Sequence, residues 1–511
     1  MMKKHYDVIV LGRSIGALVA AALLARRDFT VLLLGHGAPP PTYAVGEHTL
    51  HRRSFTFLAA SSPTWKRVIA ELAQSQTWKR RTQNAEPMLQ AIAPGFRLDI
   101  PADDRLFARE VDREFPELHH VVEQLYGRLG QANAAVDEAF DSDAMWPPGT
   151  FWERRETAKF AAGLPYVHAE PDADLLAEFP RGHFYRHFVR ASVLFGTHLS
   201  TMPPTFAVAR LHGAWTRGLT RLEAGEADLE AFLAERISSH GGQCHFSERA
   251  SSLVLRRGVA AGILIEGDEQ PTGCEYIVTD LEGEALAGLA QGQGIHKRAL
   301  REWPRITSTV GRFTVSIIVR KDGLPEALGP ESIVFLPESP FPNRARPPSI
   351  RMSRFDSAGD TSLLVAELLL PDHGPLRLSD ARGFVLRAIS RELPFVERHL
   401  LIVDSANDGL PVWTFDAGKR TQDIERHTLG LPPVEPMKRQ LEVDPPGYLG
   451  LSGEPIRGPI ERTLLLGRSV MPGLGQEGEL LAAWGVARLI TRNDRRKAIM
   501  RRDMWTKMEI G

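Results

Sequence analysis

Cysteine is scarce in this chain of 511 residues, which contains only Cys244 and Cys274. The two lie far apart and form no CxxC or CxxxC pattern. The sequence therefore predicts neither a disulfide framework nor a zinc site, and a reducing compartment is expected. The chain also has little excess of charge of either sign: 62 basic and 63 acidic residues give a formal net charge of −1. That balance gives no indication of a nucleic-acid partner.

A long apolar run without charges is lacking too. The run from Val8 to Ala25 follows Lys3 and Lys4 and could imitate a signal peptide or anchor, but Arg13 lies inside it. A buried strand, a turn and a helix account for the same residues, so we expect a cytoplasmic protein without a transmembrane span. The basic and apolar tail "TRNDRRKAIMRRDMWTKMEI" is read as a solvated helix or as a contact with the inner membrane face.

What the chain does contain is the composition of a globular protein. Hydrophobic residues make up 43% and charged residues 24%, values typical of folded domains. A chain of this length exceeds one ordinary core and predicts two or three domains.

The chain opens on a strand–helix–strand pattern. Residues 6–11 form a short apolar run rich in β-branched residues, 15–26 are rich in Ala and Leu without a breaker, and 29–34 form a second apolar run. This spacing of about 30 residues is typical of a βαβ unit that binds dinucleotides.

The glycine turn inside this unit departs from the usual fingerprint. Gly12 holds the first glycine place, Ser14 the second and Ala17 the third, with Gly16 between them. Ser14 adds a Cβ where phosphate oxygens would come closest, although its hydroxyl could donate a hydrogen bond to them. Arg13 could add positive charge to the free N–H groups of the helix start, or fill the space itself.

The end of the second strand departs as well. An acid usually stands there and binds the ribose hydroxyls, but this chain has Gly35 followed by His36. His36 could replace the acid or accept a 2′-phosphate. The motif alone therefore leaves open whether a dinucleotide is bound.

A second glycine turn lies near the C-terminus in "RTLLLGRSVMPGLGQEGELLAAWGVARLI", which repeats the order strand, turn and helix. Pro472, Gly473, Gly475 and Gly478 precede or open the helix, whose first turn presents N–H groups. Such a helix start suits the pyrimidine edge of a flavin, where negative charge collects on reduction.

These blocks, together with "GGQCHFSERASSLVLRRGVAAGILIEGDEQPTGCEYIVTD" and "LFGTHLSTMPPTFAVAR", resemble the phytoene desaturase, carotenoid isomerase and retinol saturase group of amine-oxidase-like FAD flavoproteins. The resemblance implies an α/β fold, in which a Rossmann-like FAD/NAD(P)-binding domain carries an inserted α+β substrate domain. It implies a cofactor site made of phosphate-side residues, a valine at the adenine and flavin-side residues: Gly12, Arg13, Ser14, Gly16, Val254, Gly467, Pro472, Gly473 and Gly475.

The resemblance also implies a domain arrangement. The dinucleotide-binding domain is expected to comprise residues 1–60, 205–290 and 455–511, the last including the tail. The substrate domain is expected to comprise residues 61–204, mostly helical and without a comparable strand pair, and 291–454, with an antiparallel sheet.

Two departures from the family bear on function. The family carries a glutamate where Gly35 stands, and a Gly-Gly-Arg element where this chain reads "APPPTYAVGEHTL". One hypothesis is an FAD-dependent oxidoreductase of the desaturase, saturase or isomerase type, acting on a hydrophobic polyene- or isoprenoid-like substrate. The other is a non-catalytic member of the fold that has lost FAD and binds a lipid or protein partner. NADP is an alternative cofactor.

The sequence identifies no catalytic acid or base. His183 and His187 have the i, i+4 spacing of metal ligands on a helix, but no HExxH glutamate accompanies them and no third ligand is evident. We therefore predict no metal site.

Overall fold

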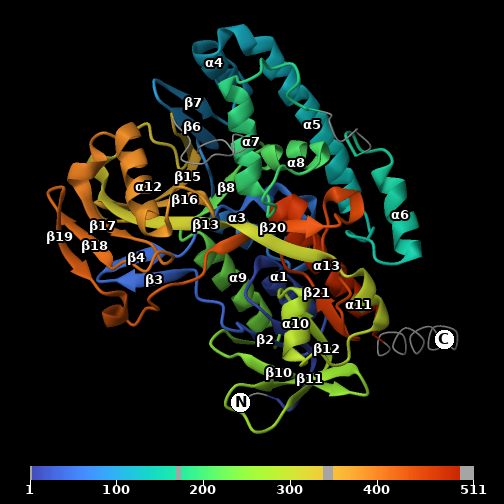
Figure 1. The fold of residues 1–511 in the computed structure, drawn as a ribbon. Coiled ribbons are helices and arrows are strands. Elements are labelled where there is room, and N and C mark those ends of the chain that lie inside the picture. Colours follow the sequence, from blue (N-terminus) through green and yellow to red (C-terminus); the bar gives the residue numbers. More distant parts are fainter. Residues whose placement is uncertain (1–2, 168–173, 338–348, 495–511) are drawn as a thin grey trace.

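The computed structural model describes residues 3–167, 174–337 and 349–494. Two β-sheets organise these residues, one largely parallel and one antiparallel, with helices packed around them (Figure 1). The predicted α/β class is confirmed.

The largely parallel sheet has seven strands in the order β10, β11, β12, β1, β2, β9, with β21 also paired to β12. The pairs β21–β12, β12–β1, β1–β2 and β2–β9 are parallel, whereas the pairs β10–β11 and β11–β12 are antiparallel. The strands come from three separated stretches of the chain: β1 (His5–Leu11), β2 (Val31–Leu34), β9 (Gln243–His245), β10 (Ala250–Arg256), β11 (Val259–Ile265), β12 (Thr272–Thr279) and β21 (Thr463–Leu465).

Helix α1 (Ile15–Arg26) is buried from Ile15 to Ala25. Its alanines let α9 (Glu226–Ser239) and α13 (Gly475–Asn493) pack closely against it. A helix that is apolar on all sides is a core helix here, which accounts for the apolar run near the start of the chain. Within the described ranges, no helix is both long and apolar enough to cross a membrane.

Arg257 and Gly258, which suggest a turn between two apolar runs of the sequence, join β10 to β11. Both residues have positive φ, 54° and 79°, as the commonest two-residue hairpin turn requires.

The antiparallel sheet has ten strands in the order β19, β18, β17, β13, β16, β15, β14, β6, β7, with β20 also paired to β13. Its long strand β13 buries a continuous run from Val310 to Val319. Helix α12 (Leu378–Glu392) packs against β13. The strands are β6 (Leu89–Ala93), β7 (Phe96–Ile100), β13 (Arg305–Arg320), β14 (Glu331–Phe335), β15 (Ser349–Asp356), β16 (Thr361–Pro371), β17 (Leu400–Asp404), β18 (Val412–Asp416), β19 (Lys419–Ile424) and β20 (Lys438–Asp444).

One expectation for the inserted region is wrong. Residues 57–190 are largely helical, but they also contain the hairpin β6–β7, which joins the antiparallel sheet through β14. The short run "LQAIA" of β6 has one β-branched residue, so its composition does not favour a strand. Pairing with β14 decides its conformation.

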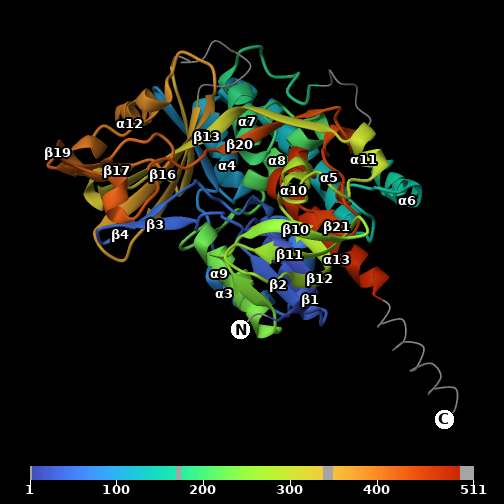
Figure 2. The same cartoon turned by 60° about the horizontal axis from the view of Figure 1, so that its bottom comes forward.

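The remaining helices surround the two sheets, and Figure 2 shows α4, α5 and α7 on the side away from β1 and β2. They are α2 (Pro63–Glu71), α3 (Ser75–Arg81), α4 (Asp104–Glu114), α5 (His119–Asp141), α6 (Phe151–Ala161), α7 (Phe184–Gly196), α8 (Thr205–Thr216), α10 (Gly283–Leu289) and α11 (Lys297–Glu302). Two small antiparallel pairs complete the fold: β3 (Thr42–Val45) with β4 (His48–His51), and β5 (Thr82–Asn84) with β8 (Thr220–Leu222).

Candidate functional site

The glycine turn after β1 is bonded to an acid of the same chain. Asp280 follows β12, the strand parallel to β1, so both strands deliver their ends to one edge of the sheet. The Asp280 carboxylate accepts hydrogen bonds from the backbone N–H groups of Arg13, at 3.0 Å, and Ser14, at 2.8 Å. Gly12 has φ 130°, and a Cβ there would lie 2.0 Å from Asp280 Oδ1. Only glycine allows this approach.

Asp280 therefore stands at the helix start, where an anion of a ligand is usually bound. Burial raises the pKa of its carboxyl, and the hydrogen bonds from Ser14 and Arg13 offset part of that rise. A ligand phosphate at this turn would meet a like charge and would find two N–H donors already bonded.

The Arg13 side chain also has a partner within the chain. Its guanidinium donates to the two carboxylate oxygens of Glu230 on α9, with Nη2 2.6 Å from Oε1, and lies 4.5 Å from the centre of the Phe246 ring. Both charged side chains are nearly buried, with 10% and 13% of their surface exposed. Arg13 is thus fixed beside the end of β2 and does not extend as a free cation.

The end of β2 has no room for the usual acid. A Cβ on Gly35 would lie 2.1 Å from the Phe246 carbonyl oxygen. His36 accepts a hydrogen bond at Nδ1 from the Ala250 N–H, at 3.2 Å. Val254 lies further along β10, paired with Gly262. Ala250, at the start of β10, therefore contacts the end of β2 through His36.

Ser14 and Gly16 have structural roles in the same turn. Ser14 Oγ accepts the Ala17 N–H at 3.2 Å and caps α1, while a Cβ on Gly16 would lie 2.9 Å from the Leu466 carbonyl oxygen. The string Gly-Arg-Ser-Ile-Gly also matches the GxSxG pattern of a hydrolase nucleophile, although no such elbow is expected from the sequence. Ser14 has φ −68° and ψ 164°, an ordinary N-cap conformation in place of the strained elbow such a nucleophile needs.

The C-terminal glycine turn is covered by residues that follow α7. Thr197 Oγ1 and the His198 N–H both donate to the Pro472 carbonyl, each at 3.0 Å. The Gly473 N–H donates to the Leu451 carbonyl at 3.0 Å. Gly475 opens α13 against Gly196, and Gly467 packs against the Asp280 backbone. The two glycine turns of the sequence thus meet at Asp280.

A histidine and a glutamate lie buried beside this turn. His198 Nε2 and Glu479 Oε1 are 2.8 Å apart. Burial would raise the pKa of Glu479, but His198, Lys438 and Arg468 lower it, so its carboxylate is ionised and accepts the proton of Nε2. Burial lowers the pKa of His198 to about 4. The neutral ring then has an unprotonated Nδ1, which is buried and has no hydrogen-bond partner among the described residues.

Two cations, Lys438 and Arg468, lie near the Glu479 carboxylate. Lys438 is an exposed residue, and desolvation of its ammonium together with the charge of Arg468 lowers its pKa to about 8. Arg468 donates Nη1 to the Arg439 carbonyl at 2.6 Å, and burial lowers its pKa. In the described part of the chain, neither side chain has a salt bridge. Lys438, Arg468 and Asp280 each retain solvent-accessible surface.

This arrangement fits FAD in part. The glycine turn does not fit the diphosphate, because Asp280 uses its N–H groups and Glu230 uses Arg13. Lys438 and Arg468 fit an anionic group, since neither forms a salt bridge among the described residues, although the Glu479 carboxylate acts on both. His198 Nδ1 fits an N–H or O–H donor of a ligand, because a buried acceptor left without a donor is costly.

A cavity reaches the C-terminal glycine turn at Pro472. It has a volume of about 560 Å³, in the range of small-molecule sites. Its wall is mixed. The apolar part includes Leu199, Met202, Pro203, Pro204, Leu441, Val443, Leu449 and Pro472, and the polar part includes Tyr166, Thr201, Thr205, Glu442 and Ser452.

We expect Glu230→Gln to lower the free energy of unfolding by about 3 kcal/mol, because it leaves the Arg13 charge nearly buried without its carboxylate. Urea denaturation measures this. Glu235→Gln on the same helix is the control, since Glu235 is half exposed and its loss should cost less than about 1 kcal/mol. Equal losses of unfolding free energy in both variants would show that the Arg13–Glu230 ion pair stabilises the protein no more than an exposed glutamate does.

His183, one of the two histidines with metal-ligand spacing, has a structural role. It caps α7 by accepting the Tyr185 N–H at 3.1 Å. Among the residues that the structure describes, no group of three or more His, Cys, Asp or Glu is arranged to hold a metal ion. The tail for which membrane contact is predicted lies, from residue 495 on, outside the described residues.

No protein-family model and no curated protein matches the sequence. Solved structures match the fold. A putrescine oxidase redesigned in its cofactor binding is 12% identical, with 96% of this chain and 99% of that chain covered and a TM-score of 0.55. An oxidoreductase from Methanosarcina mazei is 13% identical, covering 94% and 100%, with a TM-score of 0.53.

A third match is the myxobacterial chondrochloren halogenase CndH, described as a variant of FAD-dependent halogenases. It is 10% identical, covering 94% of this chain and 72% of that chain, with a TM-score of 0.43. The chain therefore has the fold of a group of oxidoreductases that includes putrescine oxidase.

Proposed function

We propose that this protein is an FAD-dependent oxidoreductase that acts on a hydrophobic, polyene- or isoprenoid-like substrate, as a desaturase, saturase or isomerase. The observation that carries this proposal is the cavity of about 560 Å³, lined in part by apolar side chains, that includes Pro472 of the C-terminal glycine turn. Apolar wall residues near the charged groups Lys438 and Arg468 suit a substrate of low polarity beside a charged cofactor.

In this proposal Lys438 and Arg468 meet the phosphate charge of the cofactor, in place of the glycine turn after β1. His198 Nδ1 accepts a hydrogen bond from the cofactor, and Glu479 holds the histidine in the required tautomer. The flavin supplies the capacity to take up or release hydride. The protein contributes binding, orientation and exclusion of water.

The test is a visible absorption spectrum of the purified protein, recorded before and after incubation with excess FAD and desalting. A flavin band retained near a one-to-one ratio supports the proposal. If neither sample retains flavin, the proposal is wrong.

A second function is favoured by the contacts at the first glycine turn. Asp280 and the Arg13–Glu230 pair occupy the positions where a dinucleotide phosphate is normally gripped. These contacts support a member of the fold that has lost FAD and binds a lipid or protein partner. A colourless protein that still binds a hydrophobic probe in the cavity at Pro472 is the result expected for this function.

We expect Met202→Trp to weaken the binding of retinol, used as a hydrophobic probe, about tenfold or more, because the larger side chain fills the cavity. The retinol fluorescence titration measures this, and the flavin content should stay unchanged. Phe395→Trp, at a position that is 65% exposed, adds the same indole outside the cavity. If Phe395→Trp weakens retinol binding to the same extent, retinol does not bind in the cavity at Pro472.

A further inference from the structure

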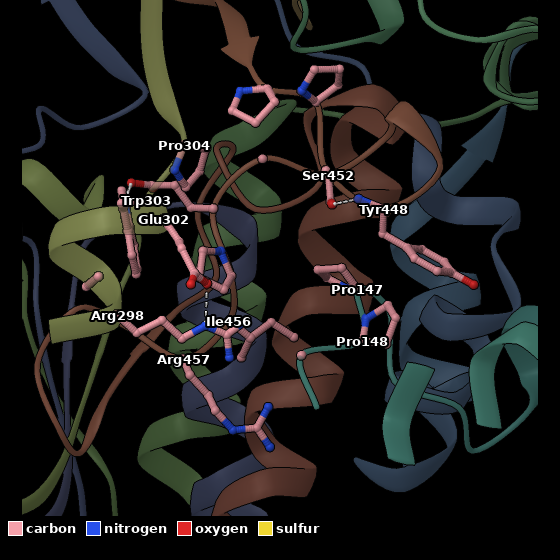
Figure 3. Close-up of a pocket in the computed structure, with 18 of the residues that line it drawn as sticks. Pro147, Pro148, Arg298, Glu302, Trp303, Pro304, Tyr448, Ser452, Ile456 and Arg457 are labelled. Carbon is pink, nitrogen blue, oxygen red and sulfur yellow. Dashed lines mark hydrogen bonds and ion pairs between the residues drawn. The ribbon is translucent and has the colours of Figure 1, made fainter. Parts of the chain in front are cut away.

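A second, larger pocket lies on the opposite side of the loop that borders the cavity at Pro472. The two share only Pro446 and Ser452 among their lining residues. The larger pocket has a volume of about 780 Å³ and is formed by the start of α6, by α11 and by residues 445–457 (Figure 3). Its lining does not include Lys438, Arg468 or Asp280.

The wall of this pocket is apolar and rigid. Six prolines line it: Pro147, Pro148, Pro304, Pro445, Pro446 and Pro455. Proline has no N–H group and a fixed φ, so such a wall offers few hydrogen-bond donors and loses little freedom when a ligand binds. Trp303, Tyr448 and Ile456 add apolar surface between the prolines.

The polar groups inside the pocket are already bonded. Trp303 Nε1 donates to Glu454 Oε1 at 2.8 Å, and Glu454 also accepts from the Gly283 N–H at 2.7 Å and from Ser469 Oγ at 2.5 Å. Burial raises the pKa of Glu454. These bonds fix the indole with its ring against the pocket. The other lining carboxylate, Glu302, is paired with Arg298.

Three guanidinium groups surround the apolar wall. Arg298 pairs with Glu302 at 2.8 Å, and Arg457 pairs with Glu153 at 2.7 Å, whereas Arg154 has no salt bridge within the described residues. Figure 3 shows Arg298 and Arg457 together below Trp303. The rim therefore carries an excess of positive charge.

Large apolar side chains are exposed beside the same rim. Phe151 and Trp152 at the start of α6 are each 70% exposed, and Leu300 on α11 is 69% exposed. Aromatic and aliphatic side chains held in water next to arginines are typical of surfaces that contact lipids or other amphipathic molecules.

We propose that this pocket binds an amphipathic anion, with an apolar chain against the prolines and Trp303 and a carboxylate or phosphate against Arg154 and Arg298. The exposed Phe151, Trp152 and Leu300 extend the apolar path from the pocket outward. The same chemistry is found in a free fatty acid and in an anionic membrane lipid, and these are the two sources to be distinguished. The proposal does not depend on flavin binding.

Oleate, titrated while Trp fluorescence is recorded, tests the pocket, with oleyl alcohol as the neutral analogue. We expect oleate to bind about tenfold more tightly than the alcohol. The double substitution Arg154→Gln and Arg298→Gln should remove that difference. Arg105→Gln on α4, which is also exposed, should leave it unchanged.

Co-sedimentation with phosphatidylcholine vesicles, with and without phosphatidylglycerol, distinguishes the sources. Binding to either oleate or the anionic vesicles that is lost in the double variant supports the proposal and names the source. The proposal is overturned if neither probe binds, or if both bind equally well to the double variant. Flavin content, measured in parallel, separates this result from the fate of the proposed function.

Discussion

Replacing Asp280 with asparagine is expected to tighten the binding of FAD about tenfold or more. In the native protein the carboxylate bonds to the N–H groups of Arg13 and Ser14, where a phosphate of a dinucleotide would be held. Two like charges about 4 Å apart repel by roughly 4 kcal/mol at an effective dielectric constant of 20. Asparagine removes this repulsion and keeps one acceptor for the turn. A tenfold change needs only about 1.4 kcal/mol of it.

Titration of the protein with FAD, followed by flavin fluorescence, measures the dissociation constant for Asp280→Asn and for the native chain. Asp268→Asn is the matched control, because Asp268 is exposed and lies in the turn after β11. If both variants bind FAD as the native protein does, the first glycine turn lies outside the cofactor site. The second function proposed above gains support only if neither variant nor the native protein binds FAD.

The second large effect concerns Lys438. We expect FAD affinity to be constant below about pH 7 and to fall as the pH rises through about 8, because that is the pKa to which desolvation and Arg468 lower the ammonium. The sign follows from the charge that binds: below its pKa the lysine is a cation and attracts phosphate, and above it the lysine is neutral. A bound phosphate would itself raise this pKa and move the fall to higher pH.

Lys438→Met should weaken FAD binding about tenfold at pH 7 and remove the pH dependence. The Lys438→Arg variant should have the FAD affinity of the native protein and should still bind FAD above pH 9, since arginine remains charged there. Lys419→Met on the exposed strand β19 serves as the control. A native profile that is flat between pH 7 and 9, with both variants unchanged, would remove Lys438 from the binding site.

Local patterns predicted the parts of the fold that depend on neighbouring residues. The β-branched run of β1, the alanines of α1 and the positive-φ turn at Arg257 and Gly258 were all readable from the sequence, because burial and backbone freedom act over a few residues. The hairpin β6–β7 was not, because its pairing with β14 joins residues more than 200 positions apart.

The departures at Arg13, Ser14 and Gly35 were also visible in the sequence, but their partners were not. Asp280 follows a predicted strand, and the rule that parallel strands deliver their ends to one edge could have drawn attention to it. Glu230 and Phe246 gave no such signal. Their contacts with Arg13 depend on how α9 and the segment after β9 pack beside β2.

The sequence by itself determined that two glycine turns exist, that the first is altered and the second better preserved, and that the fold is α/β. Only the tertiary structure decided which residues bond to the altered turn and which charges lie near His198. His198, Lys438, Arg468 and Glu479 come from three distant parts of the chain, and none belongs to a local motif. Their chemistry arises from the proximity of these charges, with His198 and Glu479 buried and Lys438 and Arg468 still in contact with solvent, and it cannot be read from spacing along the chain.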